Sequence, residues 1–508
     1  MNKFLFPSAI GHRSAAVVIA AMAMFSGAPS LAAAGNMSDL YSTAASSPVG
    51  APLSASGLAV SSGISTATSG TAFTQVAAGT YYSVGLRADG SVWTWGRTLW
   101  GELGLPDTSA VSSMVAPVRL SNLSDIVSIT TSGSGYQLAV KKDGTVWEWG
   151  QCYDNMKKTQ PPRQLAELTG VSQVSTQNIV NYALKTDGTV WAWSRNRETG
   201  VSGKPVQVQG LSKITSMNAA GDMVYTLDSA GSVWIFSSKL DGGKLSLSVP
   251  TRISGIPKLK QVSAYYANQM YGVDASGTAW KWSLDLASPI LKLTGKPTKV
   301  YPTLKIKNIQ AASDHAVLLT VEGDVWTFGK KPAGKDGKVK GLSGITSVSA
   351  GSLHSLVIDS KGQVWGWGAN QWNEVGVMRN QIDGMVYAPV RIQNPITVTV
   401  NGQLLTSSFP AVMENNLISV PLKDVAKALG GQLTTTLSDG RYIHRLDYKQ
   451  TSVTLDPRQP EVEINGQKII WSSSGASGTT MVPASLLKQM GLSVNWDSKQ
   501  SVLSINVQ

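Results

Sequence analysis

The chain of 508 residues has little cysteine and little histidine: one Cys and four His. A single cysteine excludes an internal disulfide framework and any cluster of cysteine metal ligands. The histidines, at His12, His315, His354 and His444, do not form a metal-binding motif, so we expect no metal and no cofactor. Cys152 is interpreted as an unpaired thiol in a loop, with pairing between two chains as the alternative.

Long apolar runs are also missing. No stretch of about 18 apolar residues is present, so we expect no membrane span. The short apolar run Ala15–Phe25 follows Lys3 and Arg13 and precedes the small residues Ser30–Ala34. This order is typical of a secretory signal peptide, which we assign to residues 1–34, with an uncleaved anchor as the alternative. The sequence therefore predicts a secreted, extracellular protein, with the cell wall as one place where it would associate.

Basic residues exceed acidic residues only mildly, 43 against 31. No run of five or six basic residues concentrates this excess, so we expect no nucleic-acid partner. The charge is interpreted as a contribution to solubility and to weak attraction toward anionic polymers such as cell-wall material. Residues 35–72 are rich in Ser, Ala, Gly and Thr and almost uncharged, which predicts a flexible linker.

Tryptophan is abundant where phenylalanine is scarce: 16 Trp against seven Phe. Most of the tryptophans belong to a repeat. The stretch Asp89–Gly96, with the pattern Val-Trp-x-Trp after an Asp-Gly turn, recurs at Asp143–Gly150 and Asp187–Trp193, and four weaker copies follow. The first Trp of each copy stands at 93, 147, 191, 234, 280, 326 and 365, a period near 45 residues.

Each unit combines a hairpin turn with alternating apolar residues, which predicts several short antiparallel strands. Seven such units predict an all-β seven-bladed β-propeller over residues 73–394, joined to a second, smaller α+β domain over residues 395–508. The two aromatic places of each unit are expected to fill the space between blades. The alternative is a row of exposed stacking platforms for sugars or bases. The repeated aspartates Asp89, Asp143 and Asp187 are interpreted as turn formers.

The repeat resembles that of the regulator of chromosome condensation family. Gly368–Gly376 and Trp95–Gly104 follow the family's loop after Trp-x-Trp-Gly, and Gly351–Ser355 matches its Gly-x-x-His-Ser stretch. The resemblance implies a seven-bladed propeller that binds other proteins through its loops, as secreted bacterial propellers of this fold do. The family's name-giving nucleotide exchange acts on a nuclear GTPase, which a secreted chain would not meet. Units 2 to 6 lack the loop motif.

Two further expectations concern the ring. We expect the last strand, near Pro389–Ile392, to join a blade begun by Phe73–Val76 and so to seal the propeller. His315 and His354 stand at the repeat position that Tyr82 holds in the first unit. A position that accepts both His and Tyr predicts a hydrogen bond inside the blade.

Residues 395–508 contain two similar halves. Each half has an Asn-Gly hairpin turn, at Asn401 and at Asn465, followed by a Val-Pro pair and a short helical pattern. A final hairpin is expected over residues 494–505. This order resembles the N-terminal domain of copper amine oxidases, a module also found as a stalk in secreted bacterial proteins. The resemblance does not imply copper chemistry, which belongs to another domain of those enzymes.

Trp100 and Trp372 are the propeller tryptophans outside the repeated places, each four residues after its Trp-Gly glycine. Because the first and last units are neighbours in a closed ring, both indoles are candidates for one exposed binding patch, with Tyr81, Tyr153 and Tyr265 as further loop aromatics. The alternative is that the two indoles merely cover a blade edge.

The sequence shows no Gly-x-Ser-x-Gly elbow and no phosphate-binding loop, so no catalytic residue is assigned. We therefore expect a secreted, non-enzymatic binding or scaffold protein whose partner is a protein or a cell-wall polymer. The alternative is a carbohydrate-active or other hydrolytic propeller enzyme, which would need carboxylates that converge in the central channel.

Overall fold

The computed structural model describes most of residues 72–507. The predicted signal peptide, nearly all of the predicted linker, Cys152 and Tyr153 lie outside the described residues. No helix in the described part of the chain is both long enough and apolar enough to cross a membrane. The stretches within 72–507 that are left undescribed are 106–111, 151–159, 166, 178, 197–198, 266–269, 286–290, 314, 330–335, 378–381, 394–395, 406, 408, 415–416, 439–440, 458, 460, 471–474, 477–478 and 499.

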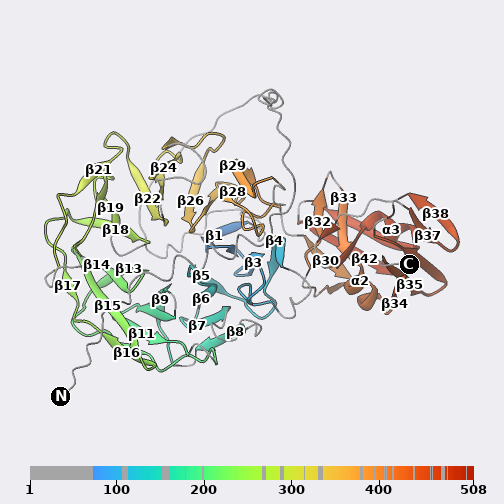
Figure 1. Cartoon of the computed structure of the whole chain (residues 1–508), viewed down its shortest axis with the longest axis horizontal. Coiled ribbons are helices and arrows are strands. Elements are labelled where there is room, and N and C mark those ends of the chain that lie inside the picture. The colour runs from blue at the N-terminus through green and yellow to red at the C-terminus, as the bar shows by residue number, and fades with distance from the viewer. Residues whose placement is uncertain are drawn as a thin grey trace, which may run out of the picture. The chain divides into compact units, whose positions relative to one another are not determined.

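Seven consecutive antiparallel sheets, each built from one contiguous stretch of chain, form the blades of a propeller. The first strand of each blade faces the centre of the ring in Figure 1. The expected all-β propeller is thus confirmed. The strands of blades 1 to 3 are β1 (Phe73–Ala78), β2 (Tyr82–Arg87), β3 (Val92–Arg97), β4 (Ser113–Arg119); β5 (Ile126–Thr131), β6 (Tyr136–Lys141), β7 (Val146–Gly150), β8 (Gln160–Leu165); β9 (Val171–Gln177), β10 (Val180–Lys185), β11 (Val190–Ser194) and β12 (Val206–Gln207).

Blades 4 to 7 follow the same meander, and blade 4 adds a fifth strand that pairs with its third strand. Their strands are β13 (Ile214–Ala220), β14 (Met223–Asp228), β15 (Val233–Asp241), β16 (Lys244–Leu247), β17 (Thr251–Arg252); β18 (Leu259–Ala264), β19 (Met270–Asp274), β20 (Ala279–Trp282), β21 (Thr298–Val300); β22 (Ile306–Ala311), β23 (His315–Thr320), β24 (Val325–Gly329), β25 (Gly337–Lys338); β26 (Ile345–Ala350), β27 (His354–Asp359), β28 (Val364–Ala369) and β29 (Met385–Arg391).

The ring is closed differently from the expectation. β29 pairs with β28 inside blade 7, and β1 pairs with β2 inside blade 1, so no blade combines the two ends of the propeller. Instead, the first residue of each inner strand donates its backbone N–H to the turn glycine of the preceding blade. The bond from Phe73 N–H to the Gly362 carbonyl (3.0 Å) is the copy that joins blade 1 to blade 7. The equivalent bond joins Ile126 to Gly90 at 3.2 Å. A repeated contact between blades therefore closes the ring without a shared sheet.

Side chains on the inner strands add a second set of bonds between blades. The amide of Gln75 on β1 both donates to the Ile129 carbonyl (2.9 Å) and accepts from the Ile129 N–H (3.0 Å) of β5. Gln173 and Gln261 make the same pair of bonds to Met217 and Ile309. The inner edge of a blade has no strand partner, so these amides satisfy backbone groups that would otherwise be unpaired.

The second aromatic of the Val-Trp-x-Trp pattern is buried in six of the seven units, as expected, whereas Phe328 of blade 6 is half-buried. Trp95, Trp149 and Trp193 are each no more than 1% exposed. These rings pack closely against a loop glycine of the preceding blade. A Cβ on Gly104 of blade 1, for example, would overlap the Trp149 ring of blade 2. At the junction of blades 7 and 1, a Cβ on Gly376 would lie 3.2 Å from Trp95 Nε1.

The first aromatic of the pattern fills this space only in part, which corrects the expectation for that place. Of the seven, only Trp93 is buried, and the other six are half-buried. Several of these indole N–H groups are bound at the hairpin turn; Trp234 Nε1, for example, donates to Asp228 (3.0 Å). The turn role of Asp89 is borne out, because its carboxylate accepts the Ser91 backbone N–H at 2.9 Å.

The His/Tyr position also differs from its expectation. Tyr82, Tyr136, His315 and His354 all begin the second strand of their blades. Tyr136 bonds Glu148 of its own blade, whereas Tyr82, His315 and His354 each bond a residue of the next blade. The acceptors or partners across the junctions are the Ser132 carbonyl for Tyr82 (2.6 Å), Ser355 Oγ for His315 (3.2 Å) and Ser83 Oγ for His354 (2.9 Å).

The C-terminal residues fold as the expected α+β unit of two related halves. β33 and β40 pair antiparallel with Val420 opposite Val482, and each strand leads through a proline into a short helix. Asn401 and Asn465 both have positive φ, as the tight Asn-Gly turns require. The elements are β30 (Thr397–Val400), β31 (Gln403–Leu404), β32 (Val412–Glu414), β33 (Leu417–Pro421), α2 (Leu422–Leu429), β34 (Gln432–Ser438), β35 (Arg441–Tyr448), β36 (Thr451–Leu455), β37 (Glu461–Ile464), β38 (Gln467–Ile470), β39 (Gly475–Ala476), β40 (Thr479–Pro483), α3 (Ala484–Gln489), β41 (Leu492–Asp497) and β42 (Val502–Val507).

Candidate functional site

The sequence-selected aromatics lie on connections at one end of the blades. In a four-stranded antiparallel meander, the first and third connections leave the sheet at the same end. Tyr81 and Tyr265 lie on first connections, of blades 1 and 5, while Trp100 and Trp372 lie on third connections, of blades 1 and 7. Tyr153 lies outside the described residues. We call the half-exposed Tyr81, Trp100 and Trp372, together with the buried Arg97, Glu102 and Glu374 of the same segments, the blade 7–1 loop face.

Trp100 is held in place by charged neighbours of its own loop. Glu102, which is completely buried, accepts the Trp100 backbone N–H at 2.9 Å and also pairs with the Arg97 guanidinium. The guanidinium carbon of Arg97 lies 3.9 Å from the centre of the Trp100 ring and 4.5 Å from that of Tyr81. Stacking on an indole and pairing with a buried carboxylate both favour this arginine position. Trp100 and Tyr81 therefore form one half-exposed cluster around a fixed cation.

The loop of blade 7 repeats part of this arrangement. The Trp372 backbone N–H donates to Glu374 at 2.7 Å, and Glu374 is also completely buried. Asn370, at the start of the loop, accepts the Val375 N–H through its side chain (2.9 Å) and so fixes the turn from inside. Trp372 itself is half-exposed. Burial raises the pKa of Glu374 to about 7, against the opposing effects of backbone N–H groups and of Arg97.

The two tryptophan loops meet across the junction of blades 7 and 1. The Asn373 side-chain amide donates to Ser113 Oγ at 2.8 Å, and Ser113 pairs with Arg97 in blade 1. The Trp95 indole N–H donates to the Glu374 carbonyl at 3.0 Å. The structure thus brings the loops of Trp100 and Trp372 side by side, as the closed ring implies.

Tyr265 contributes to a different place on the same end of the propeller. Its hydroxyl bonds Ser352 Oγ of blade 7, which also contacts the Thr80 hydroxyl of blade 1 at 2.7 Å. Thr80 in turn donates to the Gly133 carbonyl of blade 2 at 2.6 Å. First connections from four blades therefore meet through one polar cluster. Tyr265 serves as a bridge between blades 5 and 7.

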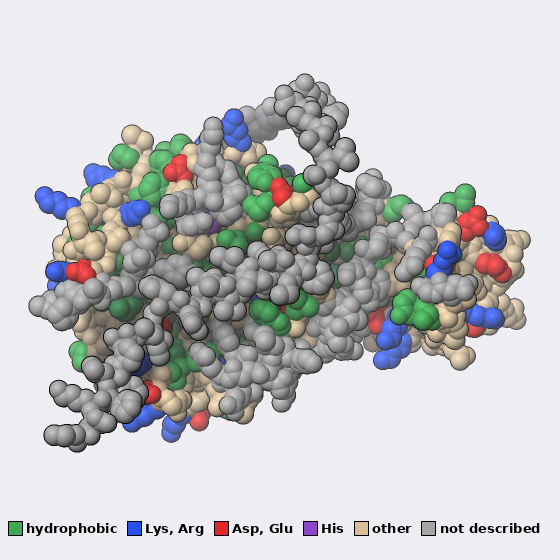
Figure 2. Space-filling view, viewed as in Figure 1, with side chains coloured by type: hydrophobic (Ala, Val, Ile, Leu, Met, Phe, Trp, Pro, Cys, Tyr) green, Lys and Arg blue, Asp and Glu red, His purple; other side chains and the backbone are tan. Residues whose placement is uncertain are grey.

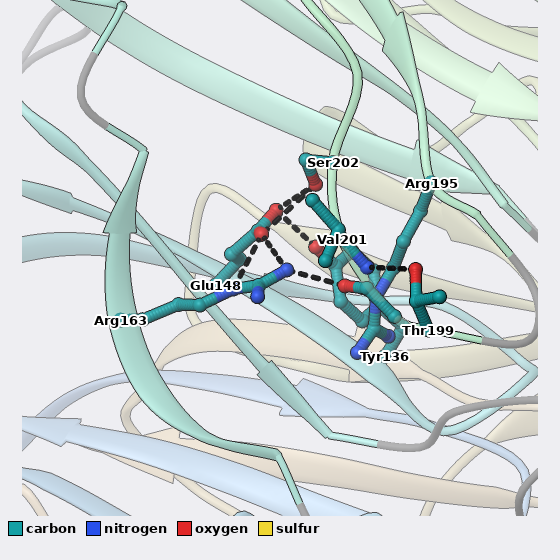
Figure 3. A network of polar contacts seen from close by, with 8 residues as sticks. Tyr136, Glu148, Arg163, Arg195, Thr199, Val201 and Ser202 are labelled. Atoms are coloured by element: carbon teal, nitrogen blue, oxygen red, sulfur yellow. Dashed lines mark hydrogen bonds and ion pairs between the residues drawn. The ribbon is translucent and has the colours of Figure 1, made fainter.

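A second buried carboxylate network joins blades 2 and 3 (Figure 3). Glu148 lies between the two tryptophans of its strand and is 2% exposed. It accepts from Arg163 at 2.7 Å, from Ser202 at 2.6 Å and from the Tyr136 hydroxyl. The Arg195 guanidinium covers the Tyr136 ring at 4.2 Å. With its oxygens satisfied by these donors, Glu148 serves to fix the third connection of blade 3 against blade 2.

Sequence reasoning missed the carboxylates and arginines that support the aromatic residues. Arg97, Glu102 and Glu374 look like ordinary loop charges in the sequence, and Glu148 like a solvent-facing residue of an alternating strand. One signal was available for Glu102 and Glu374. Both stand two residues after the extra tryptophan and two before a glycine, in the two units that follow the loop motif.

Two further kinds of site concern the described part of the chain, a metal centre and a basic patch. Among the described residues, no group of three or more His, Cys, Asp or Glu side chains is placed to hold a metal ion. On the face shown in Figure 2, the Lys and Arg side chains lie apart from one another, rather than in one continuous field.

Family models match both parts of the chain. The model of the regulator of chromosome condensation (RCC1) repeat matches residues 73–98 and 345–371, and a second model of the repeat matches residues 89–140. The model of the copper amine oxidase N-terminal domain matches residues 399–505.

Short stretches of the chain are similar to parts of two curated proteins. It is 35% identical over 77 residues to the human E3 ubiquitin-protein ligase HERC2, covering 15% of this chain and 2% of that protein. It is 34% identical over 87 residues to the mitochondrial RCC1 domain-containing protein RUG3 of Arabidopsis thaliana, covering 17% of this chain and 19% of that protein. The chain therefore spans less than a fifth of the length of these relatives.

Solved structures with a similar chain include yeast RCC1 (Prp20) bound to Kap60, with a TM-score of 0.48 and 20% identity over 62% of this chain and 87% of that one. Human WBSCR16 has a TM-score of 0.48 and 19% identity over 60% of this chain and 95% of that one. Over the matched residues, the propeller is similar to regulator of chromosome condensation repeats, and the C-terminal part is similar to the copper amine oxidase N-terminal domain.

Proposed function

We propose that this protein is a secreted, non-enzymatic binding protein that holds a protein partner on the blade 7–1 loop face. The observation that carries the proposal is the pair of neighbouring loops in which buried Glu102 and Glu374 fix the backbone of half-exposed Trp100 and Trp372. Half-exposed aromatic side chains held in a fixed conformation lose little entropy when a partner covers them. Such residues dominate the binding energy of many protein interfaces.

The channel supports a binding function over hydrolysis. A hydrolytic propeller would need at least two carboxyl groups that converge on the substrate. The seven inner strands, which line the centre of the ring, contain no Asp and no Glu. Their polar side chains, such as Gln75, Gln173 and Gln261, are already bonded to the backbone of the next blade.

Secretion and association with the cell wall form part of the proposal. Secretion rests on the sequence of residues 1–34. Association with the wall rests on the mild excess of basic residues, 43 Lys and Arg against 31 Asp and Glu. A protein partner is favoured over a wall polymer because the charges around Trp100 are internally paired. The Arg97 guanidinium is engaged by Glu102, which leaves less positive charge for an anionic polymer.

A retention experiment tests this proposal. The mature chain, immobilised, is exposed separately to purified cell-wall polymer and to the secreted proteins of the same culture. The Trp100→Ala/Trp372→Ala double variant is compared with Tyr442→Ala, which removes an aromatic residue that is 60% exposed in the C-terminal domain. We expect a protein to be retained by the wild type and by Tyr442→Ala and to be lost from the double variant. Equal retention of the protein by all three would show that the loop face is not the binding site. Retention of the polymer alone would show that the partner is a polymer and not a protein.

A further inference from the structure

The loops of blades 1 and 7 correspond residue by residue. Arg97 N–H donates to the Tyr81 carbonyl at 2.9 Å, and Ala369 N–H donates to the Leu353 carbonyl at the same distance. Ala369 therefore holds the place of Arg97, and Leu353 that of Tyr81. The tryptophans and glutamates of the two loops are equivalent as well, since each glutamate accepts the backbone N–H of its tryptophan through Oε2.

The two glutamates differ in their second oxygen. Glu102 Oε1 accepts a hydrogen bond from Arg97 Nε. Glu374 Oε1 is buried and has no hydrogen-bond partner among the described residues. The atom without a partner in blade 7 is thus the counterpart of the atom that binds a guanidinium in blade 1. A buried carboxylate oxygen without a partner is unfavourable, and a cation placed there would stabilise it.

We propose that blade 7 binds an arginine side chain of the protein partner beside Ala369, the residue that stands where blade 1 has Arg97. The incoming guanidinium would pair with Glu374 Oε1 and stack on the Trp372 indole. This inference rests on the proposed function and names the chemistry that the loop face recognises. Blade 1 supplies the internal example, because one side chain there both pairs with Glu102 and lies 3.9 Å from the Trp100 ring.

Arginine fits this place better than lysine. A planar guanidinium stacks on an aromatic face while its edge donates to a carboxylate, and an ammonium group cannot do both in the same way. Glu374 is covered in the free chain, whereas Trp372 is half-exposed. Entry therefore requires the surroundings of Glu374 to open, after which the guanidinium would lie against the Trp372 indole as Arg97 lies against Trp100.

The experiment is a titration of the full mature chain, labelled with ¹⁵N at its 16 tryptophan indoles, with N-acetyl-arginine amide at pH 8. N-acetyl-citrulline amide, which has the same shape without the charge, is the matched ligand. We expect the Trp372 indole resonance to shift with a dissociation constant in the millimolar range, on the order of tenfold tighter for arginine than for citrulline. The Trp100 resonance should stay in place because Arg97 already fills its site.

Two variants separate binding from folding. Glu374→Gln keeps the oxygen that holds the Trp372 N–H but removes the charge, so the arginine-dependent shift should disappear; Glu463→Gln, an exposed carboxylate of the C-terminal domain, should leave it unchanged. Ala369→Arg should fill the site from within the chain and abolish the shift. A Trp372 resonance that does not move, or that moves equally with citrulline, would overturn the proposal.

This titration needs no natural partner. If it fails while the Trp100→Ala/Trp372→Ala variant still loses its partner, the loop face binds proteins by other contacts. If the titration succeeds and retention is unchanged in that variant, the arginine site stands and the proposed function is wrong.

Discussion

Ser83 of blade 1 and His354 of blade 7 lie side by side across the closing junction of the propeller, with the serine Oγ 2.9 Å from the imidazole Nε2. The same hydroxyl donates to the Glu374 carbonyl at 2.8 Å. His354 is 1% exposed and Glu374 is completely buried, so two titratable groups are enclosed where the two ends of the ring meet. This junction is therefore where the stability of the propeller should depend most on pH.

Acidification should destabilise the junction through His354. Burial, assisted by His315, lowers the pKa of His354 to about 3, from an ordinary value of 6.5. The unfolded chain binds more protons than the folded chain between these values, so stability is complete above pH 6.5 and falls as the pH drops toward 3. The loss should reach roughly 3–5 kcal/mol at about 1.4 kcal/mol per pKa unit.

The measurement is the melting temperature by circular dichroism from pH 7 to pH 3.5, for wild type and His354→Gln. The variant should lose less stability than the wild type over this range. His444→Gln, in the C-terminal domain, serves as the control and should follow the wild-type propeller. Parallel curves for wild type and His354→Gln would show that His354 does not carry the acid sensitivity.

Glu374 should give the opposite dependence. Burial raises its pKa to about 7 from an ordinary 4.5, so the folded chain holds a proton that the unfolded chain releases. Stability from this group is therefore complete below pH 4.5 and is lost as the pH rises to 7, by about 3 kcal/mol. The charged groups that face it are Arg97 from blade 1 and, through Ser83, His354 from its own blade.

Replacement of Glu374 by glutamine should therefore stabilise the chain at pH 8 and leave it nearly unchanged at pH 4.5. Urea unfolding at both pH values, with Glu463→Gln as the control, gives the comparison. A Glu374→Gln variant that is less stable than the wild type at pH 8 would contradict the absence of a cationic partner for this carboxylate in the free chain.

The repeat architecture could be predicted from the sequence because its determinants are local. Asp89 accepts a backbone N–H two residues ahead, and the alternation around Trp95 places its ring on one face of β3. The structure of a blade therefore follows from residues within its own unit. The closure of the ring depends on contacts such as Ser83 with His354, 271 residues apart, which no pattern within one unit specifies. For that reason the expected shared blade was wrong.

The candidate site was predictable only as far as its aromatic residues. Trp100 and Trp372 stood out because the repeat left them unexplained, and the structure places them on neighbouring loops. Glu102 and Glu374 are buried and accept the backbone N–H groups of these tryptophans, which residue type alone does not reveal. The substitution of Arg97 by Ala369 between equivalent loops could have been read by aligning the two units.

Removal of a buried ring between blades should destabilise the propeller strongly. Trp193 is completely buried in a cluster with Tyr136 and Leu138 of the preceding blade. Trp193→Ala should lower the free energy of unfolding by about 3–5 kcal/mol, the range for large-to-small changes in a core. Trp191→Ala, which changes a half-buried ring on the same strand, should cost clearly less in the same urea experiment. Equal costs would mean that the two places pack alike.

The pair of Arg97 and Glu102 should show strong coupling in a double-mutant cycle. Both side chains are almost fully buried, so Arg97→Met leaves a carboxylate without its partner and should cost about 3–5 kcal/mol. Glu102→Gln leaves the guanidinium unpaired but keeps an acceptor for the Trp100 N–H. In the double variant neither charge is buried, so much of the cost should be recovered, with a coupling energy of roughly 1–3 kcal/mol from urea unfolding. Simple additivity of the two single changes would show that solvent screens this pair, and that the guanidinium is held mainly by its stacking on Trp100 and Tyr81.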